Sequence, residues 1–265
     1  MPDQSPSNES DLLAIKSRFV RGRNVLYARA NFSQLYVDYY LHLKDNRIEL
    51  EPSHDQRLKT ALALFSLHCI SHPRNDVLAW TVNFQDPLLN VFLGGDTGTG
   101  QVVGRIYTEN VKPAEENAFY QDIVRRGRDP HRSVVGFQGG DMIQAVETFY
   151  AFSEQRPARF FEIEPDDYAI VAAHPDYDVD WFKGLTMEQV RSLEEDEEVV
   201  DLETRFVRWS CGCNQERILK TLAPVFLSDA EELFLGEELI EVNCPRCAGK
   251  YRISRELLEA YVADH

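Results

Sequence analysis

Apolar positions along the chain follow helical and strand periodicities in a mixed order. Apolar residues at helical spacing predict helices over residues 32–43 and 55–70, and after Asp141, which is a candidate N-cap. Short or alternating apolar runs predict strands at residues 19–26 (with a turn or bulge at Gly22), 78–84, 88–93, 102–107, 119–124, 133–137, 159–163 and 168–173. Helices placed between groups of sequential strands are typical of the α+β class. We therefore expect a large N-terminal α/β core domain over residues 1–174.

Two serine-based capping boxes mark candidate helix starts. Ser53 with Gln56 predicts the start of the helix over residues 55–70, and Ser228 with Glu231 predicts a further helix start near the C-terminus. The first ten residues are polar, and we expect them to be disordered. They contain no apolar segment of the kind found in secretory signals.

The negative charge of the chain is concentrated in one stretch. The net charge is −16, and residues 162–203 account for −13 of it, with 15 acidic residues against two basic ones, Lys183 and Arg191. Like charges at this density repel one another, so we expect the stretch to be marginally ordered at best, and we assign residues 175–203 to an acidic metastable linker. Its apolar residues between Trp181 and Leu193 could dock onto a partner surface but are too few to fold alone.

Composition also excludes several classes of function. A net acidic chain lacks the positive patches that bind nucleic acid. No apolar run reaches the roughly 18 residues that span a bilayer. We expect a cytoplasmic protein in a reducing compartment, where paired cysteines indicate metal or redox chemistry. No catalytic constellation is evident, so we expect no enzymatic activity.

Two other features look like sites but have simpler interpretations. The glycine-rich run from Gly94 to Gly100 lacks the lysine of a phosphate-binding loop and is followed by no helix, which favours a hairpin turn. Cys69 lies beside His68 and His72, where a nucleophile is conceivable. Its place on an apolar helix face favours a packed core cysteine.

Four of the five cysteines form two close pairs near the C-terminus: Cys211-Gly212-Cys213 and, thirty residues later, Cys244-Pro245-Arg246-Cys247. Two pairs joined by a loop long enough to fold back are what a tetrahedral Cys₄ zinc site requires. We predict that all four cysteines bind one Zn²⁺; the alternatives are structural disulfides or free core thiols. Residues 204–265 contain little apolar core, so we expect a small C-terminal Cys₄ zinc-binding domain that depends on its metal.

The same cysteines are candidates for redox chemistry. A zinc-bound thiolate is already deprotonated, and the thiolate is the form that oxidants attack. A disulfide within a C-x-C pair closes a very small ring, so it should be strained and readily reduced, which suits a switch. Four nearby basic residues could add positive potential, although each could equally be a solvated surface residue: Arg208, Arg217, Arg246 and Lys250.

These residues resemble the heat shock protein 33 family of bacterial redox-regulated holdase chaperones. In the C-terminal part the resemblance rests on both cysteine pairs, on the Asn-Gln-Glu-Arg run that ends at Arg217, and on Tyr251. In the N-terminal part it rests on Phe19-Val20-Arg21-Gly22, on Val134-Val135-Gly136-Phe137, and on the run from Ser153 to Phe161.

The resemblance implies a redox-regulated, ATP-independent chaperone. It implies zinc on all four cysteines in a reduced, inactive state, and disulfides Cys211–Cys213 and Cys244–Cys247 after oxidation. Loss of zinc would unfold the small domain and destabilise the linker, exposing apolar surface to unfolding client proteins. The active form would usually be a homodimer.

Two other functions can be weighed for a protein with a cysteine cluster. A constitutive zinc-ribbon interaction module would use the metal for structure alone, without redox switching. A metal-dependent hydrolase would need an open coordination position, which four cysteine ligands do not leave.

Overall fold

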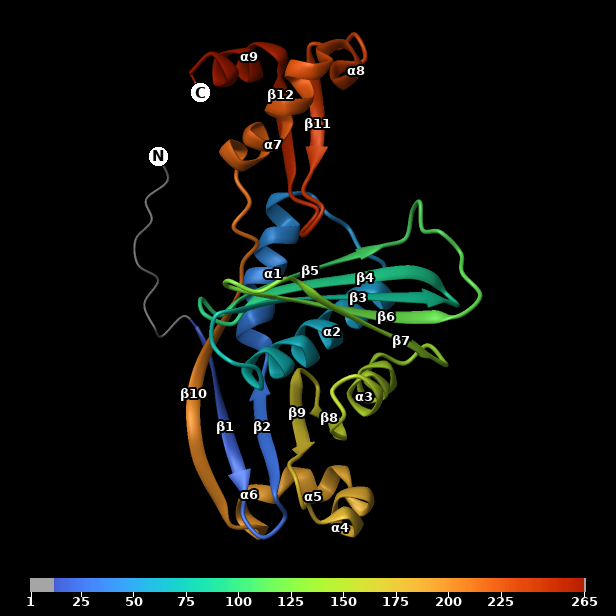
Figure 1. Cartoon of the computed structure of the whole chain (residues 1–265), viewed down its shortest axis with the longest axis vertical. Coiled ribbons are helices and arrows are strands. Elements are labelled where there is room, and N and C mark those ends of the chain that lie inside the picture. The colour runs from blue at the N-terminus through green and yellow to red at the C-terminus, as the bar shows by residue number, and fades with distance from the viewer. Residues whose placement is uncertain (1–11, 265) are drawn as a thin grey trace.

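A ten-stranded sheet is the framework of the part of the chain that the structure, a computed structural model, describes (residues 12–264). In order across the sheet, the strands are β7 (His131–Phe137), β6 (Asn117–Arg125), β3 (Asp76–Gln85), β4 (Leu88–Asp96), β5 (Gln101–Tyr107), β10 (Val199–Trp209), β1 (Leu13–Val20), β2 (Val25–Asn31), β9 (Asp167–Ala173) and β8 (Ala158–Glu164). Neighbouring strands are antiparallel except at the join of β10 to β5, which is parallel and involves two residue pairs. This short join allows the two halves of the sheet to run across one another (Figure 1).

The core lies between the two halves of the sheet and is built around the helix α2 (Pro52–Ile70). Every residue of α2 from Ala61 to Ile70 is buried, and the helix contacts β4 and β5 in one half and β9 in the other. The helices α1 (Ser33–Asp45) and α3 (Met142–Phe152) complete this core. A helix segment enclosed on all sides is predominantly apolar around its circumference, as residues 61–70 of α2 are, whereas the first half of the helix is polar and partly exposed.

Most of the predicted elements of this domain are present. The eight predicted strands and the three predicted helices are found near their expected positions, and the first predicted strand is the hairpin β1–β2, which turns at Gly22 with φ +74°. The Asp141 side chain caps α3 by accepting from Gln144 N, as expected. The glycine-rich run is a hairpin turn between the antiparallel strands β4 and β5. The prediction of disorder for residues 1–10 lies outside the described residues.

Both predicted capping boxes are wrong. The N-cap of α2 is Glu51, which makes no side-chain cap, and Pro52 takes the first helical position, where the missing N–H needs no partner. Ser228 is the last residue of α7 (Gln215–Ser228), and the neighbouring Asp229 caps α8 (Ala230–Phe234) by accepting from Glu232 N at 2.9 Å. In both places a residue next to the predicted one is the stronger helix-start signal.

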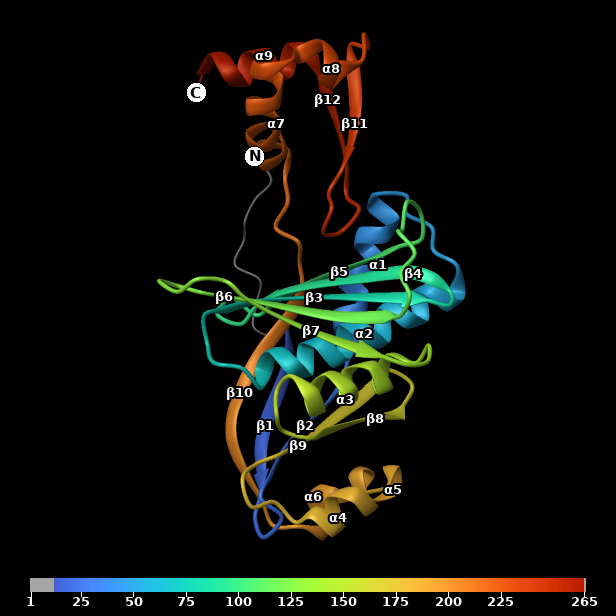
Figure 2. The same cartoon turned by 45° about the vertical axis from the view of Figure 1, so that its right-hand side comes forward.

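The acidic stretch is more ordered than its charge predicted. After β9 it forms three short helices, α4 (Val179–Gly184), α5 (Met187–Arg191) and α6 (Leu193–Asp196), which lie at the opposite end of the molecule from the C-terminus (Figures 1 and 2). The apolar residues of these helices join a second buried cluster with side chains of β1, β2, β8 and β9. Their carboxylates pair with basic residues of the β1–β2 hairpin: Arg18 with Glu194 at 2.8 Å, and Arg23 with Asp178 at 2.8 Å. The expected self-repulsion is thus offset by a basic surface elsewhere in the chain.

The strand β10 was not predicted. It follows α6 and pairs with β1 from Val199 to Val207, so the large sheet extends almost to the first cysteine pair. Arg205 fixes its middle by donating to the carbonyl oxygen of His72 at 2.6 Å, just after the C-terminus of α2. The division of the chain at residues 174 and 203 stays a prediction, and β10 spans the second of those positions.

The C-terminal residues form a separate small unit beyond the large sheet (Figure 2). The helices α7 and α8 are followed by the hairpin β11 (Leu239–Asn243) and β12 (Lys250–Ser254) and by α9 (Arg255–Asp264). Its buried core consists of few side chains: Ile218, Leu219, Phe234, Ile253 and Leu258. Among residues 12–264, the helices are too short or too polar to cross a membrane.

Candidate metal centre

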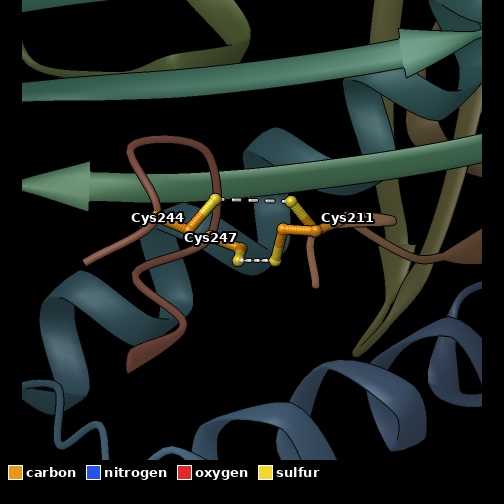
Figure 3. Close-up of side chains that lie close together, drawn as sticks. Cys211, Cys244 and Cys247 are labelled. Carbon is orange, nitrogen blue, oxygen red and sulfur yellow. Dashed lines mark hydrogen bonds between the residues drawn. The ribbon is translucent and has the colours of Figure 1, made fainter. Parts of the chain in front are cut away.

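The four paired cysteines come together where the large sheet meets the C-terminal unit. Cys211 and Cys213 follow the end of β10, and Cys244 and Cys247 lie in the turn between β11 and β12. Figure 3 shows Cys211, Cys244 and Cys247 with their side chains directed toward a common centre. The two pairs, distant in sequence, therefore face one another, as the spacing predicted.

The sulfur positions suit a metal ion better than disulfides. The Sγ atoms of Cys211 and Cys244 are 3.7 Å apart, those of Cys213 and Cys247 are 3.5 Å apart, and all four lie within 4.8 Å of one another. Tetrahedral zinc with Zn–S bonds of about 2.3 Å places its sulfurs about 3.8 Å apart, whereas a disulfide bond is about 2.05 Å long. All four cysteines are free thiols. They could hold a metal ion, and zinc is compatible with four sulfur ligands.

The crowded sulfurs perturb one another's protonation. Contact with the Cys211 thiol lowers the pKa of Cys213 to about 6, and the Tyr251 hydroxyl, which donates to Cys213 Sγ at 3.0 Å, acts in the same direction. The Cys211 thiol likewise lowers the pKa of Cys244. The pKa values of Cys211 and Cys247 are raised, because each keeps a proton shared with its neighbours. Four thiolates this close repel one another, so full deprotonation requires a cation among them.

A tight turn sets the positions of Cys244 and Cys247. Cys244 N donates to Gly249 O at 2.8 Å, and Ala248 N donates to Cys244 O at 2.9 Å. The left-handed residue of the turn is Ala248, with φ 60°, and not the glycine that follows it. Gly249 is required by close approach instead, since a Cβ atom there would lie 3.3 Å from Cys247 Sγ and 3.4 Å from the His42 ring.

Two of the four predicted basic residues contact the backbone of the first cysteine pair. Arg217 donates to Gly212 O at 2.8 Å, and Arg246 lies 3.5 Å from Cys211 O. Lys250 N donates to Asn46 Oδ1 at 2.9 Å, and Arg208 pairs with Gln101 in the sheet.

Sequence reasoning missed the large-domain residues that border the cluster. His42, Arg105 and Tyr107 hydrogen-bond to main-chain carbonyls of the turn at residues 244–247, from positions 138 to 205 residues away in the chain. No local pattern marks such residues, because they become neighbours of the cysteines only through the fold.

Cys69 is a packed core residue, as predicted. It is 5% exposed, it is absent from the sulfur cluster, and its Sγ would lie 3.0 Å from a Cβ added at Gly95. Burial raises the pKa of its thiol well above the usual range. A thiol that resists ionisation is a poor nucleophile, so the structure favours the packing role.

Comparison with known proteins gives concordant matches. The model of the family described as Hsp33 protein matches residues 162–254. The chain is 24% identical over 158 residues to the 33 kDa chaperonin of Nitrosococcus oceani, covering 52% of this chain and 55% of that protein. It is 36% identical over 83 residues to the 33 kDa chaperonin of Caldanaerobacter subterraneus subsp. tengcongensis, covering 31% of this chain and 28% of that protein. The matched regions thus span about half or less of these relatives.

A solved structure extends the likeness over nearly the whole chain. The crystal structure of the 33 kDa chaperonin (heat shock protein 33 homolog) of Thermotoga maritima superimposes with a TM-score of 0.71 and 16% sequence identity. The match covers 95% of this chain and 98% of that one. At this identity the comparison establishes a common fold, in which helices pack against one large sheet.

Proposed function

Because the chain belongs to the Hsp33 protein family, we propose that it is a redox-regulated, ATP-independent chaperone, a holdase, that binds unfolding proteins once its clustered cysteines are oxidised. The observation that carries the proposal is the cluster of four free thiols within 4.8 Å, at the junction of the large sheet and the C-terminal unit. A change at this junction acts on both parts of the molecule at once.

In the reduced state, Cys211, Cys213, Cys244 and Cys247 ligate one Zn²⁺. The ion would hold the four thiolates together and so tie the end of β10 to the β11–β12 turn. The small core of the C-terminal unit supports the need for this tie, because a unit of this size rarely folds on apolar burial alone.

In the oxidised state, the pairs within each motif become disulfides, Cys211–Cys213 and Cys244–Cys247. Each pair loses two electrons, which reduce one peroxide to two molecules of water with the uptake of two protons. Both sulfurs of a pair are then unavailable as thiolate ligands, so the zinc is released. The support for this pairing is the family resemblance, because the 3.7 Å and 3.5 Å sulfur separations join Cys211 to Cys244 and Cys213 to Cys247 and do not select it.

The client-binding surface in this proposal is the apolar face beneath α4, α5 and α6. Phe182, Leu185, Val190 and Leu193 of these helices are at most 4% exposed. If the helices leave, they uncover buried side chains of the sheet: Val20, Val25, Tyr27, Phe161, Ile163, Ala169, Val171 and Ala173. A contiguous apolar surface of this kind binds unfolded chains without a nucleotide.

Cytoplasmic location, a homodimeric active form and the absence of enzymatic activity belong to the same proposal. The competing function is a constitutive zinc-ribbon interaction module, in which the metal is never released. The two functions differ in a measurable way, because only the chaperone couples loss of zinc to a gain of client binding.

The test measures zinc content and suppression of aggregation on the same samples, before and after peroxide with mild unfolding stress or after hypochlorite. We expect the reduced protein to contain one zinc and protect no client, and the oxidised protein to lose the zinc and protect. Cys247→Ser should lose most of its zinc affinity, whereas Cys69→Ala, the matched control, should switch as the wild type does. Retention of zinc through oxidation, or protection that does not follow its release, would favour the constitutive module.

A further inference from the structure

The turn that contains Cys244 and Cys247 is bound to the large domain through its main-chain carbonyls. Arg105 Nη1 donates to Cys244 O at 3.0 Å, and the Tyr107 hydroxyl donates to Pro245 O. His42 Nε2 lies 2.9 Å from Cys247 O. Three of the four carbonyls of the turn at residues 244–247 are thus contacted by side chains that are not themselves ligands.

A second layer of contacts holds these donors in place. Asn46 Nδ2 lies 3.2 Å from His42 Nδ1, so the amide donates there and the imidazole proton is on Nε2, directed at Cys247 O. The same Asn46 accepts from Lys250 N through Oδ1 at 2.9 Å. Asn46 therefore joins the end of α1 to both the turn and the start of β12.

The donors come from rigid elements and not from loops. Arg105 and Tyr107 are two apart on β5, so they project from the same face of the strand. The Arg105 guanidinium lies over the Tyr107 ring, 4.4 Å from its centroid, which orients both side chains. His42 is in the last turn of α1, and its ring lies 4.4 Å from that of Trp209, at the end of β10.

Hydrogen bonds form a large part of this contact, because packing between the turn and the large domain is incomplete. A cavity of about 650 Å³ lies between them, and its lining includes His42, Arg105, Tyr107 and Cys247. With open space on one side of the turn, the directed bonds add to the packing of Cys244 and Cys247 in setting its position.

We propose that His42, Asn46, Arg105 and Tyr107, here called the docking residues, control how tightly the cysteine cluster retains its metal. Their bonds form only when the turn is folded with its carbonyls toward the large domain, which is the arrangement that also brings Cys244 and Cys247 to the other pair. Metal binding and docking therefore stabilise the same state of the turn, and each strengthens the other. The inference rests on the proposed metal site and adds which residues control how fast the metal leaves it.

The test compares release of zinc from full-length reduced protein to a chelating dye. Tyr107→Phe removes one hydroxyl, and His42→Phe removes one imidazole while keeping a ring against Trp209. Partners outside the ligand set typically contribute about 10–100-fold to metal affinity, so we expect each variant to lose zinc about tenfold or more faster than the wild type. The matched control is Tyr40→Phe, which removes a hydroxyl from the same α1 helix where it binds Asp55, and should release zinc at the wild-type rate.

A second measurement does not depend on variants. Removal of zinc from the wild type should increase amide hydrogen exchange in the last turn of α1, although α1 contains no cysteine. Release rates in both variants equal to that of the wild type, or unchanged exchange in α1, would overturn the inference while leaving the metal site intact. A wild-type protein that binds no zinc would overturn both the inference and the proposed function.

Discussion

At the scale of single residues, two buried histidines of the large domain, His68 and His72, resist protonation. The ring of His68, on α2, lies 4.2 Å from that of His72, just after the helix ends, and His68 Nδ1 bonds the Tyr150 hydroxyl at 2.7 Å. Both Nε2 atoms are buried without a hydrogen-bond partner among the described residues. Burial lowers the pKa of both, and Arg156 acts in the same direction on each, whereas Glu154 and Asp76 partly oppose it at His72.

This pair predicts an acid-sensitive large domain. A histidine whose pKa is lowered by folding contributes stability above the unfolded pKa of about 6.5, and loses it as the pH falls, because the unfolded chain takes up the proton first. We expect the free energy of unfolding to fall below about pH 6.5 by up to about 1.4 kcal/mol per pH unit for each histidine. Urea unfolding from pH 7.5 to 5 measures the slope. It should flatten in the double variant His68→Gln/His72→Gln and persist in the exposed His131→Gln; an equal slope in all three proteins contradicts the prediction.

At the scale of elements, charge complementarity positions the helices that cover the apolar sheet face. Arg23 is the most connected residue of this contact: it pairs with Asp178 at 2.8 Å and Glu197 at 3.0 Å, and its guanidinium lies 5.3 Å from the Trp181 ring centroid. These pairs are about one-third exposed, so each is modest in energy and screened by salt. The ion pairs therefore add modestly to the apolar cluster that packs beneath these helices.

Arg23→Ala should weaken the docking of α4–α6 on the sheet and leave the cysteines unchanged. Loss of two ion pairs and a cation–π contact is expected to weaken docking of α4–α6 by about 1–2 kcal/mol. Amide exchange over residues 179–196 should rise, and the oxidised variant should protect clients at a lower unfolding stress than the wild type. Arg132→Ala, which breaks an ion pair with Asp122 of similar length (2.7 Å) elsewhere, should change neither. Equal exchange in the two variants would show that apolar packing alone holds the helices.

At the scale of the whole molecule, the main core of the large domain and the core of the C-terminal unit are very unequal. The large core contains α2 and side chains from both halves of the sheet, and it extends to Cys211, Cys244 and Cys247. The core of the C-terminal unit has five buried side chains. Stability should therefore be distributed unevenly, and metal loss should act mainly on one end of the chain.

Chelation of zinc should destabilise the C-terminal unit most, so that it unfolds at a lower temperature than the large domain. We expect amides of α7, β11 and β12 to lose protection from hydrogen exchange, while those of α2 and β3 stay protected, because the latter depend on apolar burial and not on metal. Thermal unfolding should change from one transition to two. A single transition that shifts as a whole would instead show that the two cores unfold cooperatively.

Much of the fold and the centre of the site could be predicted from local sequence. The cysteines were predictable because each pair is close in the chain, so that backbone geometry alone sets two sulfurs near one another. The strands and helices of the large domain were predictable because their apolar positions repeat with the period of the element. By contrast, α7 carries Pro224 in its interior, a residue that normally indicates a helix break, and it was not predicted.

Local sequence therefore predicts most elements of the large domain and a set of cysteines that could hold a metal ion, since both depend on residues within a few positions of one another. Which distant groups meet depends on the packing of the whole chain. The charge of the acidic stretch predicted self-repulsion, but Arg18 and Arg23 form ion pairs with it in the fold. Likewise, the sequence around Cys244 did not indicate that His42 and Arg105 hydrogen-bond to its turn. Such pairings depend on how the whole chain packs, and no local periodicity encodes them.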